Sequence, residues 1–234
     1  MNFEEWEPVY EQILADFGFD RTGDEHARDV LAELLREMAD GQQSPHHALS
    51  KLEFEGETVA VAGAGPTLED DLDIVEGASA VVAASDAARR LRELGYDVDC
   101  MVTDLDKTPE TARTLTTEGV PVVVHAHGDN VSALESYVPS FDPSAVIPTT
   151  QARPTDRVRN FGGFTDGDRG AFLADELGAA RLVFPGWAFD DPTVSDQKRQ
   201  KLAWAARLLH WLEHRRDEQF AVLDDRRDTL DSLF

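Results

Sequence analysis

Two aspartates, Asp104 and Asp106, stand directly after a short apolar segment of the chain. Paired carboxylates in such a position can hold Mg²⁺, a hard cation that prefers oxygen ligands and usually keeps waters and substrate phosphates in its shell. The chain contains 46 acidic residues, so an Asp-x-Asp pair can also arise by chance and form a solvated acidic loop. The same spacing recurs at Asp71/Asp73, Asp97/Asp99 and Asp166/Asp168. The structural context of each pair must therefore decide its meaning.

A second polar segment, residues 125–130 with the sequence His-Ala-His-Gly-Asp-Asn, follows another apolar run. Its two histidines, His125 and His127, have the His-x-His spacing that could bind zinc. No cysteine or third histidine lies close by in the sequence, however, and the surrounding acids suit magnesium better. A simple turn has no need of two histidines, so the segment is a candidate part of a functional site.

Glycines could bring the backbone close to a phosphate at Gly63-Ala64-Gly65-Pro66. Gly63 and Gly65 allow a close approach of the main chain, and Pro66 fits the first position of a following helix. The third glycine of a dinucleotide-binding fingerprint is missing, because Leu68 stands in its place. A tight turn between a strand and a helix, without a ligand, is the alternative interpretation.

The glycine-rich residues 160–170 carry Asp166 and Asp168 at the start of a predicted helix. The N-terminus of a helix favours phosphate, and Arg169 could neutralise phosphate charge. Thr165, with Asp168 three residues later, also matches a capping box, which would give Asp168 a purely structural role.

Lysine is rare in this chain, which has four: Lys51, Lys107, Lys198 and Lys201. Two of them, Lys198 and Lys201, stand with Gln197 and Arg199 at the start of a predicted C-terminal helix. This basic cluster could bind phosphates beside an otherwise acidic cleft. A solvated helix face is an equally good interpretation.

The overall charge narrows the classes of partner. The 234 residues carry a formal net charge of −24, which opposes binding of nucleic acid through a positive surface. The acid excess predicts a halophilic protein whose fold loosens at low salt, where carboxylate repulsion is unscreened.

The single cysteine, Cys100, excludes an intramolecular disulfide and fits a reducing compartment. With neither a signal peptide nor an apolar run long enough to span a membrane, we expect a cytoplasmic protein with no membrane partner.

Six short apolar runs rich in β-branched residues predict buried strands of a parallel sheet. They are Thr58–Ala62, Ala80–Ala84, Cys100–Val102, Val120–Val124, Ala145–Ile147 and Arg181–Phe184. Predicted helices lie between several of them, at Thr67–Glu76, Ala87–Leu94 and Asp168–Leu177. This alternation is typical of an α/β fold with a Rossmann-like, mostly parallel sheet flanked by helices. Ligands bind beyond the carboxyl ends of such strands, where the polar segments described above stand.

The two ends of the chain are predicted to be helical. We expect an N-terminal helical segment at residues 1–50, an α/β catalytic domain at 51–194 and C-terminal helices at 195–234, beginning with a long helix.

Within the first segment, apolar spacing predicts a helix over Phe3–Phe17 and a second helix after an N-cap at Asp24, and the turn-prone residues Gly41–Pro45 form the boundary. The apolar faces of the terminal helices suit capping of the sheet, which we favour, or a homodimer contact.

Five motifs occur in order along residues 55–212, followed by the lysine-bearing helix. They are Gly63-Ala64-Gly65-Pro66, Thr103-Asp104-Leu105-Asp106, the segment 125–130, residues 160–169 and Gly186-Trp187-Ala188-Phe189. Together they resemble the archaeal 6-hydroxymethyl-7,8-dihydropterin pyrophosphokinase family. That family is similar in fold to the catalytic domain of thiamine pyrophosphokinases, whose acidic motifs resemble Thr103–Asp106 and Thr165-Asp166. Lys107 stands where the thiamine enzymes carry serine.

The resemblance implies a Mg²⁺-dependent transferase with ATP as co-substrate. ATP would donate its β,γ-pyrophosphoryl group to the primary hydroxyl of the pterin, with release of AMP. The metal ligands implied are Asp104, Asp106, Asp166 and Asp168. The phosphates would be held by Gly63, Gly65, Arg169, Lys198 and Lys201. Asp129 and Asn130 would bind the pterin ring, and the catalytic set would be His125, His127, Asp129 and Lys198, with one histidine orienting the hydroxyl or helping to remove its proton.

Two other functions fit parts of the sequence. A nucleotide-sugar glycosyltransferase also uses Asp-x-Asp after a strand of a Rossmann-like sheet, to hold Mn²⁺ and a sugar diphosphate, and it would release a nucleoside diphosphate rather than AMP. A non-catalytic nucleotide-binding module would bind ATP without turnover. Such a module would lose little function when His127 or Asp129 is mutated.

Overall fold

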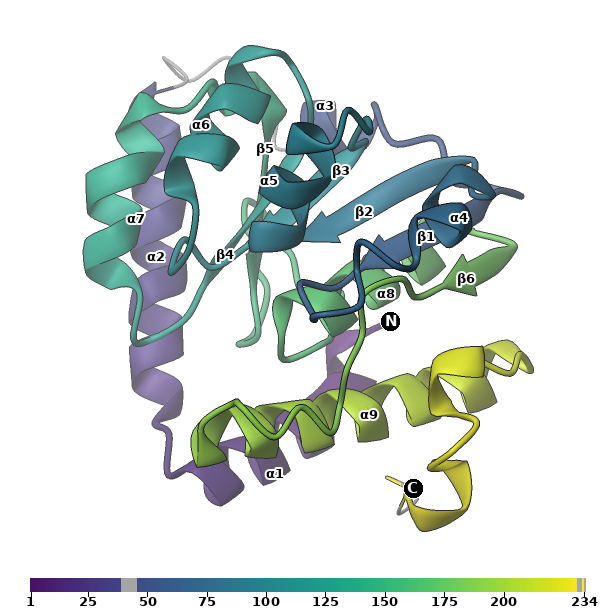
Figure 1. Cartoon of the computed structure of the whole chain (residues 1–234). Coiled ribbons are helices and arrows are strands. Elements are labelled where there is room, and N and C mark those ends of the chain that lie inside the picture. Colours follow the sequence, from purple (N-terminus) through teal and green to yellow (C-terminus); the bar gives the residue numbers. More distant parts are fainter. Residues whose placement is uncertain (39–45, 231–232, 234) are drawn as a thin grey trace.

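Six parallel strands form a sheet at the centre of the molecule (Figure 1). The computed structural model describes residues 1–38, 46–230 and 233, and within them the strand order is β5-β4-β3-β2-β1-β6. The strands are β1 (Thr58–Ala62), β2 (Ala80–Ala84), β3 (Cys100–Thr103), β4 (Val122–Ala126), β5 (Val146–Thr150) and β6 (Arg181–Val183). Strands β2 to β5 are buried along their whole length, as expected when both faces of a parallel sheet are covered. The predicted parallel sheet is confirmed.

Helices cover both faces of the sheet. They are α1 (Phe3–Phe17), α2 (Arg21–Met38), α3 (His46–Leu49), α4 (Leu72–Glu76), α5 (Asp86–Glu93), α6 (Pro109–Thr117), α7 (Val131–Tyr137), α8 (Asp166–Glu176) and α9 (Asp196–Arg216). The chain runs from β1 to β5 through α4 to α7 on one face and returns through α8 on the other face, so that β6 lies beside β1. The loops after β1 and β6 therefore leave toward opposite faces, which is where open α/β sheets form their binding crevice.

Alternate residues of each strand belong to two separate hydrophobic clusters. In β1, Val59 and Val61 pack in one cluster with side chains of α1, α8 and α9, whereas Ala60 and Ala62 pack in the other with side chains of α2, α4, α5, α6 and α7. This division follows from the strand geometry, because successive side chains point to opposite faces. The alternate residues of β1 therefore contact helices on opposite faces of the sheet.

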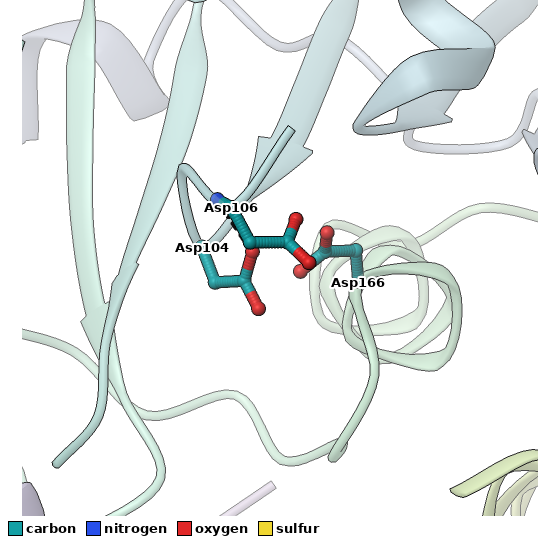
Figure 2. Close-up of side chains that lie close together, drawn as sticks. All are labelled: Asp104, Asp106 and Asp166. Carbon is teal, nitrogen blue, oxygen red and sulfur yellow. Dashed lines mark hydrogen bonds between the residues drawn. The ribbon is translucent and has the colours of Figure 1, made fainter. Parts of the chain in front are cut away.

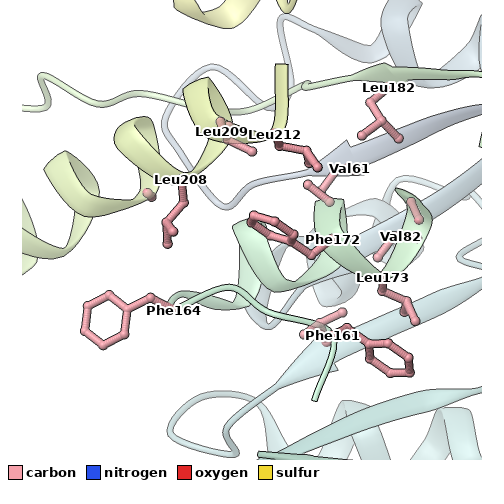
Figure 3. Close-up of a cluster of buried hydrophobic side chains, with 14 of the residues drawn as sticks. Val61, Val82, Phe161, Phe164, Phe172, Leu173, Leu182, Leu208, Leu209 and Leu212 are labelled. Atoms are coloured by element: carbon pink, nitrogen blue, oxygen red, sulfur yellow. The ribbon is translucent and has the colours of Figure 1, made fainter. Parts of the chain in front are cut away.

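Helix α8 lies between the sheet and α9 (Figure 3). Gly170 lets it approach the strands closely, because a Cβ at this position would lie only 3.0 Å from Cγ1 of Val82. On its other side, Phe172 packs in one cluster with Leu209 and Leu212 of α9. This tight packing fixes the N-terminus of α8, where Asp166 stands, at the carboxyl ends of the strands.

The two terminal helices α1 and α9 lie side by side on one face of the sheet (Figure 1). Trp204 donates to Asp16 (3.0 Å), and Arg215 donates to Glu5 (3.2 Å), so the helices run antiparallel. Their apolar faces belong to the same hydrophobic cluster as the sheet, which is the predicted capping arrangement. In the part of the chain that the structure describes, no helix is long and apolar enough to cross a membrane.

The prediction that Asp24 caps the second helix is wrong. Helix α2 begins at Arg21, and Asp20 makes the capping contact by accepting a hydrogen bond from the Thr22 N–H (3.1 Å). Asp24 is buried in the first turn of the helix, where other donors reach its carboxylate. The predicted boundary at Gly41–Pro45 lies outside the described residues.

The helix expected over Thr67–Glu76 is shorter than predicted. Turns occupy residues 66–70, and α4 begins only at Leu72, so Pro66 does not start a helix. Two contacts with the loop after β6 account for the difference: Asp71 accepts from the Gly186 N–H (2.9 Å), and the side chain of Leu68 packs against Gly186. The tertiary contacts override the local helical pattern.

The loops after β1 and β6 touch through their backbones. Gly63 donates its N–H to the Pro185 carbonyl (2.9 Å), and Gly65 donates its N–H to the Gly186 carbonyl (2.7 Å). A Cβ at Gly63 would lie 2.7 Å from the Gly186 oxygen, and a Cβ at Gly65 would lie 2.5 Å from it. Glycine is thus required at both positions by the close approach of another backbone segment.

We predict that Gly63→Ala destabilises the protein, because its methyl group collides with a backbone oxygen that cannot rotate away. The expected loss is about 1–3 kcal/mol in the free energy of unfolding. Thermal unfolding in roughly 2 M KCl, where surface repulsion is screened, measures it. The matched control is Ala64→Ser in the same loop, at an exposed position, with an expected change within about 0.5 kcal/mol. Equal stabilities of the two variants would contradict the prediction.

Candidate active site

A cavity of about 430 Å³ lies at the carboxyl ends of the strands. The loops that follow all six strands contribute to its wall, and the first turns of α8 and α9 complete it. The polar and glycine residues of the wall include Gly63, Gly65, Ser85, Asp104, Asp106, Lys107, His127, Asp129, Gln151, Thr165, Asp166, Gly167, Arg169, Lys198 and Lys201. The cavity therefore occupies the position in which open α/β sheets bind ligands.

Three carboxylates meet in this cavity (Figure 2). Asp104 and Asp106 come from the loop after β3, and Asp166 comes from the first residue of α8. One oxygen of each lies within 4.8 Å of the others. Among the described residues no histidine or cysteine joins this group. An all-carboxylate donor set suits a hard divalent cation such as Mg²⁺ better than zinc.

Local backbone geometry places these carboxylates. Leu105, between the two aspartates of the β3 loop, has a φ of 67°, and Ser85 after β2 has a φ of 35°. Thr103 accepts a hydrogen bond from the Leu105 N–H (2.9 Å), and the Ser85 hydroxyl donates to Asp166 (2.5 Å). Non-glycine residues in the left-handed region are uncommon and are found preferentially at functional sites. The chain thus adopts two unfavourable conformations at the point where the carboxylates converge.

A buried arginine lies beside the cluster. Arg169 donates from Nη1 to Asp166 (3.2 Å) and from Nη2 to the side-chain oxygen of Gln151 (3.2 Å). Among the described residues, its buried Nε atom has no hydrogen-bond partner. The guanidinium thus supplies a positive charge next to the carboxylates.

Burial and mutual repulsion shift the pKa values of the clustered carboxyl groups. Burial raises the pKa of Asp166 to about 7, and the charge of Asp104 adds to this shift. Partial desolvation and the same neighbour raise the pKa of Asp106 to about 6. Burial also opposes ionisation of Asp104, but hydrogen bonds with His127 and Asp106 and the charge of Arg169 outweigh it and lower the pKa. The cluster therefore retains protons near neutral pH, and a divalent cation would displace them.

Three of the four lysines of the chain line the same cavity, namely Lys107, Lys198 and Lys201. Within the described ranges, none of the three pairs with a carboxylate. Arg199, by contrast, pairs with Asp196 on the surface of α9. In a chain with a net charge of −24, three unpaired lysines at one cavity indicate an anionic ligand.

The segment 125–130 divides into two halves with different surroundings. His127 and Asp129 line the cavity, and Nε2 of His127 lies 3.5 Å from Oδ2 of Asp104. His125 is only 2% exposed and does not line the cavity; its Nδ1 lies 3.1 Å from the Thr149 hydroxyl. Burial lowers the pKa of His125 well below its ordinary value, because it disfavours the charged imidazolium.

Asn130 lies behind the cavity wall and connects two loops. Its amide nitrogen donates to the carbonyl oxygens of Asp104 (2.8 Å) and His125 (2.7 Å), and its oxygen accepts from the His127 N–H (3.0 Å). These contacts engage both polar atoms of the side-chain amide, and Asn130 is absent from the cavity wall. Asn130 therefore connects the loop after β3 to the loop after β4 through hydrogen bonds.

Asp168 is also engaged away from the cavity. It forms a capping box with Thr165, in which its Oδ2 accepts from the Thr165 hydroxyl (2.7 Å) and its Oδ1 accepts from the N–H groups of Thr165 and Phe164. Asp168 is fully buried and is not part of the carboxylate cluster. The capping interpretation of the sequence is confirmed, and the structure brings together Asp104, Asp106 and Asp166 without it.

The loop glycines make no free donors. The N–H groups of Gly63 and Gly65 are both bonded to the loop after β6, although the two residues line the cavity. Trp187 from that same loop also lines the cavity; it donates to the Val61 carbonyl (2.8 Å), and its ring fills the space where a Cβ of Gly167 would lie. These glycines therefore shape the wall through close packing.

Sequence reasoning missed Gln151, which stands directly after β5 and lines the cavity. The rule that ligands bind after strand ends would have found it, had the fifth strand been extended to Thr150. The predicted strand ended at Ile147, just before Pro148, whereas β5 continues through this proline because it is an edge strand, where proline is tolerated.

We predict that Asp166→Asn weakens binding of Mn²⁺, used as a probe for Mg²⁺, by about 10- to 100-fold, because it removes one anionic ligand. Calorimetric titration measures the dissociation constant. Asp191→Asn is the matched control, since it removes one negative charge from the same cavity wall without touching the cluster. If both substitutions weaken Mn²⁺ binding equally, the affinity depends on the total negative charge of the cavity and Asp166 is not a ligand.

The raised pKa of Asp166 predicts a pH-dependent stability of the metal-free protein. The native state keeps a proton that the unfolded chain releases, so this group lowers the free energy of unfolding as the pH rises from about 4 to about 7. Asp166→Asn removes the titrating group. In chelator at about pH 8 the variant should exceed the wild type by about 1–3 kcal/mol, and the gain should shrink toward about pH 5. Thermal unfolding measures the stability difference between the variant and the wild type. A difference that does not change with pH would mean that titration of Asp166 is not its cause.

Comparisons with known proteins agree with the geometry. A family model described as 6-hydroxymethylpterin diphosphokinase MptE-like matches residues 32–193. Among the similar curated proteins, the 6-hydroxymethyl-7,8-dihydropterin pyrophosphokinase of Methanothermobacter thermautotrophicus is 37% identical over 93% of this chain and 97% of its own length. Proteins of the same name from Pyrococcus furiosus and Methanocaldococcus jannaschii are 36% and 31% identical, over 92% and 94% of this chain and 95% and 99% of their own lengths. The chain therefore belongs to the MptE-like 6-hydroxymethylpterin diphosphokinase family.

Proposed function

We propose that this protein transfers the diphosphate group of ATP to the hydroxyl of 6-hydroxymethyl-7,8-dihydropterin, giving the pterin diphosphate and AMP. The observation that carries the proposal is the meeting of three carboxylates with three unpaired lysines in one cavity of about 430 Å³. A polyphosphate held through a divalent cation needs both kinds of group. The names of the three relatives supply the substrate class.

The donor set fits Mg²⁺. Asp104, Asp106 and Asp166 offer oxygen ligands, and the raised pKa values of Asp106 and Asp166 express the repulsion that a cation would relieve. When bound, Mg²⁺ would neutralise part of the polyphosphate charge. We assign metal ligation to these three residues, and we leave to Asp168 its capping role.

The reaction moves one group between two oxygens. The pterin hydroxyl oxygen forms a bond to the β-phosphorus of ATP and loses its proton to His127 or to water. The bond from that phosphorus to the oxygen bridging it to the α-phosphorus breaks, so that AMP leaves with the electron pair. Little covalent chemistry falls to the protein, and alignment and charge stabilisation dominate. We assign the phosphates to Lys198, Lys201 and Arg169, whose positive groups line the cavity.

The pterin contacts fall to the residues of the segment 125–130 that line the cavity. Asp129 is exposed there, and within the described residues its carboxylate has no ion pair or side-chain hydrogen bond, so it can accept from the N–H groups of a pterin ring. His127 is the histidine that can reach the substrate hydroxyl. His125 and Asn130 would support these two residues from behind the wall.

The direct test is a nucleotide assay with the purified protein in roughly 2 M KCl, where screening favours the acidic fold. ATP, Mg²⁺ and the pterin are supplied, and chromatography follows the nucleotides. AMP and a pterin diphosphate should appear together, and only when the pterin is present. Formation of ADP instead of AMP would refute the proposal. No turnover by protein shown to be folded would also refute it and would favour a nucleotide-binding module.

We predict that Lys198→Ala lowers kcat/KM by about 100- to 1,000-fold, because it removes a cationic group from the transferring phosphates. Arg199→Ala is the matched control on the next position of α9, since Arg199 pairs with Asp196 and does not line the cavity. Its kcat/KM should stay within about threefold of the wild-type value. Similar losses in the two variants would remove Lys198 from the site.

A further inference from the structure

We propose that Asp24, in the N-terminal helix α2, is a positioning residue that holds two neighbouring loops of the cavity wall, those after β4 and β5. The inference rests on the proposed function for its kinetic readout. Asp24 lies outside residues 32–193, which match the family model, and it does not line the cavity.

The carboxylate of Asp24 is buried and surrounded by neutral donors. The residue is only 4% exposed. Its Oδ1 accepts from the Gly128 N–H (2.8 Å), and its Oδ2 accepts from the Tyr10 hydroxyl (2.6 Å) and from Nε2 of Gln151 (2.7 Å). In the described part of the chain no lysine, arginine or histidine forms an ion pair with it. A carboxylate in such a place is costly unless its hydrogen bonds are kept, so its contacts are strongly constrained.

One chain of hydrogen bonds connects Asp24 to the charged groups of the site. Because a carboxylate only accepts, Asp24 makes Gln151 present its NH₂ group to it, which turns the Gln151 oxygen toward Arg169. Arg169 in turn donates to Asp166 of the carboxylate cluster. The main chain of Gln151 is held separately, because its carbonyl accepts from Nε1 of Trp6 (2.9 Å). The orientation of the Gln151 amide is thus the part that Asp24 controls.

A second hydrogen bond connects Asp24 to the segment 125–130, which we assign to pterin binding. The Gly128 N–H bonded to Asp24 lies between His127 and Asp129, which line the cavity. The backbones touch at this point: a Cβ at Gly23 would lie 3.3 Å from Cα of Gly128. The first turn of α2 therefore sets how far this loop extends into the cavity.

The test exchanges the two partners. In Asp24→Asn, an NH₂ group would face the NH₂ group of Gln151; if Gln151 turns its amide over, the same conflict moves to Arg169. In Gln151→Glu alone, two carboxylates would face each other. In the double variant Asp24→Asn/Gln151→Glu, the new amide at position 24 can donate to the new carboxylate at position 151. That carboxylate can also accept from Arg169, and the amide oxygen at position 24 can still accept from Gly128. The formal charge of the pair is unchanged.

Each variant is assayed for AMP formation and, independently, for calorimetric binding of Mg²⁺-ATP, with activity expressed per folded molecule. Asp24→Asn should lower kcat/KM by about 10- to 100-fold and weaken nucleotide binding, because a misplacement of about 1 Å has effects of that size. The double variant should recover most of both losses. Tyr10→Phe is the matched control, because it removes a hydrogen bond from the same carboxylate but leaves the contacts of Asp24 with Gln151 and Gly128 in place. Its kcat/KM should stay within about threefold of the wild-type value.

The outcomes separate the two claims. If the wild type binds Mg²⁺-ATP but forms no AMP with the pterin, the proposed function fails, and the binding series alone tests Asp24. If folded Asp24→Asn matches the wild type in both readouts, or if the double variant is no better than the single variants, the positioning role is refuted. Should the single variants not fold, a folded double variant with most of the wild-type activity supports the role, and an inactive one refutes it.

Discussion

The repulsion among three carboxylates at the strand ends is the constraint on which the rest of the site depends. Asp104, Asp106 and Asp166 cannot all be ionised side by side without a compensating positive charge, and the raised pKa values of Asp106 and Asp166 express that cost. The fold nevertheless holds them together, through two residues with positive φ and the packing of α8 against the sheet. Stability is given up at the point where we propose that a cation, and a polyphosphate with it, binds.

The same constraint explains the distribution of positive charge. Most of the arginines in the described ranges pair with the abundant surface acids, whereas Lys107, Lys198 and Lys201 stay unpaired at the cavity. Surface ion pairs contribute little to stability, but a carboxylate paired with a site lysine would compete with a phosphate. An acidic protein with an anionic substrate needs site lysines that form no ion pair. Within the described ranges, α9 and the loop after β3 place three such lysines at the cavity.

Much of this arrangement could be predicted from short-range patterns. The apolar runs identified the strands, and the position of Asp104 and Asp106 after β3 followed from strand order and the strand-end rule. Thr165 and Asp168 could be recognised as a capping box, which the structure shows, and Asp168 stands outside the group of three carboxylates at the strand ends. What could not be predicted depends on long-range packing. Asp24 and Gly128 are 104 positions apart, and the buried state of His125 depends on the neighbouring strand.

Isotope labelling can show whether this protein transfers the β,γ-diphosphate of ATP to the pterin hydroxyl. The pterin is prepared with oxygen-18 in its hydroxyl group, and the products are examined by phosphorus NMR and mass spectrometry. We expect the label to stay in the pterin diphosphate, bonded to the phosphorus that was the β-phosphorus of ATP, and AMP to be unlabelled. Labelled AMP, or a pterin that carries a single phosphate with ADP as the other product, would contradict this expectation.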